Sequence, residues 1–124
     1  RSVSMKNVAM GIVIKEDQVL LVNRRFPPKL WSPPGGFTDK DELPEQTVQR
    51  EVWEETGIRC KVLKKIHEFA SYQSQISVYA CKYISGELRC SFESIDVDWF
   101  PLDNLPDPIS PDSSIFKKAF AVLK

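Results

Sequence analysis

The sequence has 124 residues, of which 42% are hydrophobic and 27% charged, values typical of one globular domain with a single core. Lys plus Arg and Asp plus Glu both number 17, and this balance excludes an overall basic field that would draw the chain to nucleic acid or a membrane. No apolar run approaches the roughly 20 residues that span a bilayer, and no signal-peptide core is visible, so we expect a cytoplasmic protein.

The chain opens with two apolar runs of strand length. Residues 1–4 precede Met5 and are set aside as a vector-derived remnant, which leaves residues 5–124 as a single domain. Residues 8–14 and 19–22 are hydrophobic without alternation, so we expect strands that are covered on both faces.

Polar and proline-rich residues follow the second of these strands. Arg24 and Arg25 stand at its end, where they either bind an anionic substrate or protect a sheet edge. Only one of the two can point into a site if the strand alternates through them. A loop stiffened by prolines then leads to a turn at Gly35 and Gly36.

The next segment has the pattern of a helix. We expect it to cover residues 44–56 and to stop at Gly57, with Asp41 or Glu42 as the capping residue because Leu43 has no side-chain acceptor.

Further strands are expected at residues 60–66, 76–84, 87–92 and 97–100, with a hairpin turn at Ser85-Gly86. Such a hairpin would place Cys81 opposite Cys90, although the three cysteines indicate neither a zinc site nor a disulfide framework. A last helix is expected to start at residues 110–112, with a hydroxyl cap followed by proline. Strands with one central and one terminal helix indicate a mixed α/β layered domain.

The central helix carries an acidic cluster. Glu51, Glu54 and Glu55 are neighbours on a helix surface and repel one another unless cations lie among them. Three glutamates alone are most often a solvated face, but residues 36–58 hold seven acidic residues against two basic ones. This charge favours a divalent cation, and carboxylate oxygens are the ligands that Mg²⁺ prefers.

The same segment resembles the signature of the Nudix hydrolase family, in its MutT-like group. The family pattern is G-x5-E-x7-R-E-U-x-E-E-x-G-U, where U is a bulky apolar residue. The matching positions are Gly36, Glu42, Arg50, Glu51, Val52, Glu54, Glu55, Gly57 and Ile58. Residues 31–36 and 99–106 are similar to the segments that flank the signature in the family.

The resemblance implies a Nudix fold, an α/β/α sandwich around a central mixed sheet, with one catalytic helix and a C-terminal helix. It also implies hydrolysis of a nucleoside diphosphate linked to another group, assisted by Mg²⁺ or Mn²⁺. The metal ligands expected on this basis are the Gly36 carbonyl, Glu51, Glu54, Glu55 and Glu93. Asp96 and Asp98 are alternatives to Glu93.

Roles for other residues follow from the same resemblance. Glu51 is the first choice for the general base, since a base need only reach the attacking water. Arg50 is expected to brace a glutamate, with Glu54 at i+4 as the candidate. Arg24 and Arg25 resemble residues that bind the substrate's phosphates or base.

Two classes of function remain open at this point. The first is a pyrophosphohydrolase that acts on a nucleoside triphosphate, a dinucleoside polyphosphate or an ADP-ribose-type compound. The second is a nucleotide-binding or sensing module without turnover, because a fold alone does not determine function. The expected partner is a small-molecule nucleotide, without stable nucleic acid or membrane binding, and the protein is expected to be a monomer or homodimer.

Overall fold

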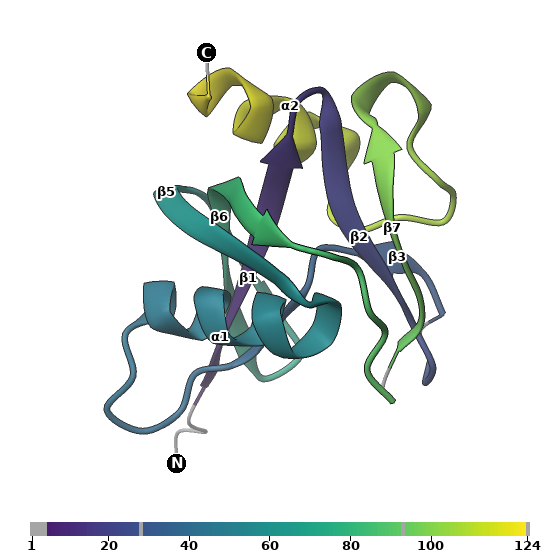
Figure 1. Ribbon diagram of the computed structural model, residues 1–124. Helices are drawn as coiled ribbons and strands as arrows, with labels where there is room; N and C mark the ends of the chain where they lie inside the picture. Colours follow the sequence, from purple (N-terminus) through teal and green to yellow (C-terminus); the bar gives the residue numbers. More distant parts are fainter. Residues whose placement is uncertain (1–4, 28, 93, 124) are drawn as a thin grey trace.

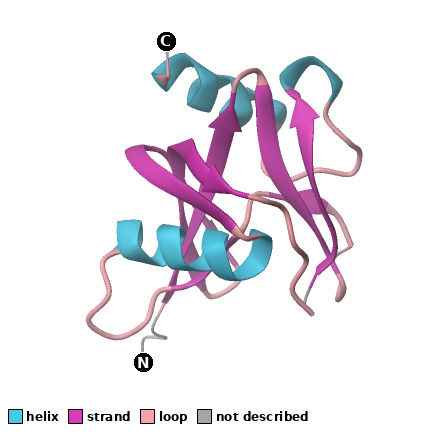
Figure 2. Ribbon diagram, viewed as in Figure 1, coloured by secondary structure: helices cyan, strands magenta, loops and turns pink. Residues whose placement is uncertain are grey.

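A mixed β-sheet is the centre of the fold. The computed structural model describes residues 5–27, 29–92 and 94–123 of the chain. Seven strands form the sheet, with the order β3-β2-β1-β6-β5, while β4 pairs with β1 and β7 pairs with β2. The strands are β1 (Lys6–Lys15), β2 (Gln18–Arg24), β3 (Trp31–Ser32), β4 (Gly35–Phe37), β5 (Ile58–Ser71), β6 (Ser74–Gly86) and β7 (Ser94–Pro101). Figure 1 shows their arrangement, and Figure 2 separates strands from helices and loops.

Strand β1 organises the sheet because it pairs with three partners. It runs parallel to β6 along most of its length, from Lys6 opposite Ser74 to Ile14 opposite Lys82. Its first half pairs antiparallel with β4, and its last residues pair antiparallel with β2. The glycine pair of β4 is therefore fixed beside the first half of β1.

Two helices cover the sheet, α1 (Pro44–Thr56) and α2 (Ser113–Val122). Ala9 and Val13 of β1 pack in one buried cluster with Val48 and Val52 of α1. The alternate residues of β1 pack in a second cluster with Phe116 of α2. Because successive side chains of a strand point to opposite faces, the helices lie on opposite faces of the sheet. The α/β/α sandwich expected from the sequence is confirmed, and Figure 1 shows α2 in yellow above α1.

The expected central helix is confirmed at residues 44–56, and its termination at Gly57 has a clear cause. Gly57 has φ 78, in the left-handed region that favours glycine, and its N–H donates to the Trp53 carbonyl at 2.9 Å. The expected cap was wrong. Leu43 is the N-cap residue and its N–H donates to Gln46 Oε1 at 2.8 Å, while Glu42 binds elsewhere.

The expected hairpin at Ser85-Gly86 was also wrong. Residues 87–92 form no strand, and β6 pairs instead with β5, which precedes it in the chain. The turn of this hairpin lies at Tyr72 and Gln73, where the sequence carries neither glycine nor proline. Cys81 therefore does not face Cys90: it shares a buried cluster with Cys60 of β5, and Cys90 is exposed.

Two further expectations need correction. Gly35 and Gly36 lie in a short strand rather than in a turn, because they pair with β1. The C-terminal helix begins at Ser113, and its cap is Asp112, whose carboxylate accepts from the Ser114 N–H at 3.4 Å. Ser110 therefore lies before the helix. Neither α1 nor α2, the helices of the described residues, is long and apolar enough to cross a membrane.

Candidate active site

The glycine pair of β4 lies directly against the acidic face of α1. A Cβ atom on Gly36 would lie 2.1 Å from Glu51 Oε2, far inside contact distance. The Gly35 N–H donates to Glu55 Oε2 at 3.2 Å. Glycine at these two positions therefore lets two carboxylates approach the backbone of β4 closely.

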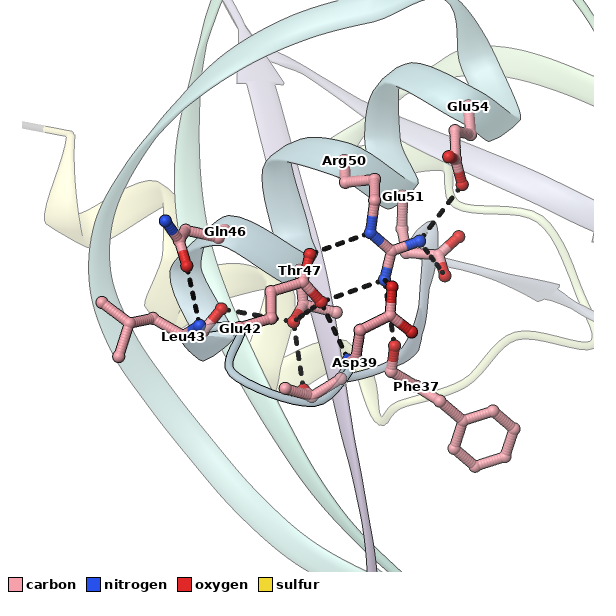
Figure 3. A network of polar contacts seen from close by, with 10 residues as sticks. Phe37, Asp39, Glu42, Leu43, Gln46, Thr47, Arg50, Glu51 and Glu54 are labelled. Carbon is pink, nitrogen blue, oxygen red and sulfur yellow. Dashed lines mark hydrogen bonds and ion pairs between the residues drawn. The ribbon is translucent and has the colours of Figure 1, made fainter.

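Arg50 connects the loop before α1 with the acidic residues on it (Figure 3). Its Nε lies 2.9 Å from Glu42 Oε2 and its Nη2 lies 3.1 Å from Glu42 Oε1, a paired geometry that is stronger than a single contact. Its Nη1 reaches Glu51 at 3.3 Å and Glu54 at 3.2 Å. Arg50 thus binds Glu54 as expected, but its main partner is Glu42.

The pKa of Glu42 reflects this arrangement. Hydrogen bonds from Arg50, and then from the Asp39 N–H, hold the pKa of Glu42 at about 2, below its ordinary value of 4.5. The same pair raises the pKa of Arg50, with the hydrogen bond to Glu42 as the largest cause. Both groups are therefore charged at neutral pH.

Thr47 supports Glu42 from the first turns of α1. Its side chain is fully buried, and its hydroxyl lies 2.8 Å from Glu42 Oε1 and 3.1 Å from Thr38 Oγ1. A hydroxyl has one proton, which here goes to the carboxylate, so Thr38 is left as the donor to Thr47. This chain of contacts fixes the loop between β4 and α1.

A pocket of about 500 Å³ opens beside the glycine pair. It joins the acidic face of α1 to the sheet and to the end of β2. The lining residues are Val8, Met10, Val22, Arg24, Phe26, Ser32, Pro33, Gly35, Gly36, Phe37, Glu51, Glu55, Ser71, Tyr72, Ser74 and Ile76. The predicted site residues Gly36, Glu51, Glu55 and Arg24 are therefore brought together in one cavity.

The other predicted site residues lie outside this lining. Arg25 donates from Nε to the Phe92 carbonyl, so only Arg24 of the pair lines the pocket, as strand alternation required. Glu54 turns toward Arg50, with 55% of its side chain exposed. Glu93 lies outside the described residues.

The two alternatives to Glu93 also lie outside the lining. The Asp96 and Asp98 carboxylates each accept a hydrogen bond from the N–H of the next residue, at 2.9 and 2.8 Å. These local contacts occupy them at the strand β7.

The environment of Glu51 differs from that of its neighbours. Burial raises its pKa, and the hydrogen bond with Glu55 and the charge of Arg50 oppose this shift. A partly buried carboxylate beside a second one is a common arrangement at functional sites.

The donor chemistry of the pocket fits a divalent cation. Within the described part of the chain, no three acidic, histidine or cysteine side chains converge as a metal-binding group, since Glu54 points to Arg50. The pocket nevertheless offers Glu51, Glu55 and the backbone of a glycine that leaves room for close approach. All of these donors are oxygen atoms, the type that Mg²⁺ and Mn²⁺ prefer.

Sequence reasoning missed the aromatic rim of the pocket. Phe26, Phe37 and Tyr72 line it, and their exposed fractions are 56%, 55% and 103%. They come from three separate segments, so no local pattern in the sequence connects them. The available signal was only an aromatic residue in each of three polar or glycine-rich stretches.

An α/β/α sandwich with acidic residues on α1 beside a glycine pair defines a class of hydrolase. The sequence pattern of the NUDIX domain matches residues 5–120. The chain belongs to the Nudix hydrolase family.

Three relatives illustrate the range of this family. A MutT-like protein of Streptomyces ambofaciens is 40% identical over 99 residues, which cover 78% of this chain and 64% of the relative. An ADP-ribose pyrophosphatase of Methanocaldococcus jannaschii is 34% identical, with 77% and 62% covered. In a MutT NUDIX hydrolase crystal structure from Burkholderia pseudomallei, the identity is 26%, the TM-score 0.79, and coverage 98% and 100%. The chain spans less than two thirds of the length of the two curated relatives.

Proposed function

We propose that the pocket binds a nucleoside diphosphate linked to another group and hydrolyses its phosphoanhydride bond with Mg²⁺ or Mn²⁺. The observation that carries this proposal is that Glu51 and Glu55 line the same pocket as Gly36 and Arg24. Metal-binding donors and a phosphate-binding cation are therefore within reach of one ligand. Residues 5–124 act as a single catalytic domain in this proposal.

Each residue has a defined task in the proposed reaction. Glu51, Glu54, Glu55 and the Gly36 carbonyl hold the metal, with Glu93 as a further predicted ligand. The bound cation neutralises phosphate charge and lowers the pKa of water. For Glu54 to join the ligands, its carboxylate must leave Arg50, a contact that is exposed and therefore weak.

The remaining charged residues position and bind. Arg24 attracts the phosphates from the end of β2, opposite the carboxylates. Arg50 holds Glu51 from one side through its contact at 3.3 Å, so that the other oxygen is available to orient and deprotonate the attacking water. Glu42 keeps Arg50 in place for this purpose.

The names of the relatives support a pyrophosphate linkage in the substrate. One is an ADP-ribose pyrophosphatase, and a relative from Mannheimia succiniciproducens, 36% identical over 111 residues, is an NAD-capped RNA hydrolase. ADP-ribose and the NAD cap both contain a nucleoside diphosphate joined to a second group. This chain covers 41% of the latter relative, so RNA is not carried over as a partner.

The experiment is a substrate panel with purified protein and Mg²⁺ or Mn²⁺. ADP-ribose, NAD, nucleoside triphosphates and dinucleoside polyphosphates are incubated separately, and nucleoside monophosphate, phosphate and pyrophosphate are quantified. We expect metal-dependent release of a nucleoside monophosphate from at least one compound. The Glu51→Gln variant, which keeps the side-chain shape, is the matched control and should be inactive. Silence across the panel with retained nucleotide binding would contradict the proposed hydrolysis.

The proposal includes a setting for the protein. A small nucleotide is its partner, and the cytoplasm, where such compounds and Mg²⁺ are abundant, is its location. Size-exclusion chromatography with light scattering distinguishes the monomer from the homodimer.

A further inference from the structure

The turn between β5 and β6 carries an unusual residue. Tyr72 has φ 55, in the left-handed region where glycine and asparagine are the ordinary occupants. Its side chain is fully exposed, so no burial of the ring offsets the cost of this backbone conformation. Folding alone therefore gives no reason for tyrosine at this position.

The ring of Tyr72 belongs to the rim of the pocket that holds Glu51 and Glu55. Phe26, after β2, and Phe37, at the end of β4, contribute to the same rim. Large apolar side chains on a protein surface are normally scattered singly, and their concentration around one opening indicates a binding role.

The start of β1 brings Tyr72 and Phe37 to the same end of the sheet. The Lys6 N–H donates to the carbonyl of Gln73, the residue after Tyr72, at 2.9 Å. The Lys6 Nζ lies 5.4 Å from the centre of the Phe37 ring, and Phe37 pairs with Val8 in the sheet. The two aromatic residues therefore lie on either side of the first residues of β1.

The inner wall next to these rings is apolar. Val8, Met10 and Ile76 form this wall, and Arg24 is the one cationic side chain among the described lining residues. A highly charged second group would find no further cation there. A flat, uncharged ring matches the apolar wall and the aromatic rim.

We propose that Tyr72 is a specificity-determining residue that stacks on the nucleobase of the substrate while its phosphates lie at Arg24 and the α1 carboxylates. This inference rests on the proposed function, because it assigns the end of the same ligand that does not react. Stacking on an aromatic side chain accepts any base, so the residue selects base-bearing compounds over base-free ones rather than one base over another.

The test uses equilibrium binding of two ligands that the enzyme cannot hydrolyse. Isothermal titration calorimetry in Mg²⁺ measures α,β-methylene-ADP, which carries a base, and methylenediphosphonate, which does not. The variants are Tyr72→Asn, which suits the left-handed backbone, and Tyr72→Phe, which keeps the ring. Ile84→Ala, at an exposed apolar residue of β6 outside the pocket, is the control.

We expect Tyr72→Asn to weaken binding of the nucleotide analogue by about tenfold or more, and to leave methylenediphosphonate unaffected. Tyr72→Phe and Ile84→Ala should stay within about twofold of the parent protein. The melting temperature of Tyr72→Asn should be equal or higher, because asparagine tolerates the turn conformation. A merely structural tyrosine would give the opposite, a lower melting temperature with unchanged affinity.

Two results would overturn the inference. One is equal affinity of Tyr72→Asn and the parent for the nucleotide analogue. The other is a parent protein that binds the analogue no more tightly than methylenediphosphonate. Both readouts are independent of turnover, so loss of hydrolysis across the substrate panel would contradict the proposed reaction without affecting this result.

Discussion

Glu42 offers the sharpest test of how the site is held together. Its carboxylate accepts two hydrogen bonds from Arg50, one from the Asp39 N–H at 3.0 Å and one from the Thr47 hydroxyl. The Glu42→Gln variant keeps the size of the side chain but removes the charge and one acceptor oxygen. We expect it to lower the free energy of unfolding and to loosen the Arg50 contact with Glu51.

The size of this effect follows from the pKa of Glu42. The shift from 4.5 to about 2 spans about 2.5 pH units, and at 1.36 kcal/mol per unit it corresponds to about 3 kcal/mol. This is an upper limit, because the side chain keeps 14% of its exposure and water screens the pair. Since glutamine still accepts one of the hydrogen bonds, we expect a loss of about 1–2 kcal/mol at pH 7.

The pH dependence gives the sign. A carboxylate whose pKa is lowered by folding contributes its full stability above pH 4.5, and this contribution is lost as the pH falls toward 2. Urea unfolding of the parent and Glu42→Gln at pH 7 and pH 3 should therefore show a difference that shrinks by at least half at pH 3. Glu45→Gln, at an exposed glutamate in the first turn of α1, is the matched control and should change stability by less than about 1 kcal/mol. An equal loss in both variants, or a Glu42→Gln effect independent of pH, would refute this reasoning.

Three further outcomes concern activity. Glu54→Gln should lose Mg²⁺ affinity and most of kcat while its melting temperature stays near that of the parent, because the side chain is 55% exposed; unchanged turnover would remove Glu54 from the ligands. Arg24→Ala should raise KM by about tenfold, whereas Arg25→Ala should stay within about twofold in the same steady-state assay, since only Arg24 lines the pocket; the reverse order would contradict this assignment. Gly36→Ala should lower kcat by about 100-fold, because its methyl group would displace Glu51; normal kcat would show that the position of Glu51 is not critical.

Local patterns were sufficient for much of the fold. The strands around residues 8–14 and 19–22 and the helix at residues 44–56 follow from hydrophobic runs, helical periodicity and a terminal glycine, which act between near neighbours in the chain. The expected strand at 87–92 failed because pairing partners are chosen across the sheet. β6 found a better partner in β5 than in the segment that follows it.

The same division applies to the site. The sequence by itself determined the family, the acidic face of α1 and the need for glycine at residue 36, since these depend on residue type and short spacing. Only the tertiary structure decided that Arg50 binds Glu42 first, that Arg24 rather than Arg25 lines the pocket, and that a turn tyrosine lies at its rim. The physical reason is distance along the chain: β1 brings together side chains that are many residues apart, and no local preference encodes which of them meet.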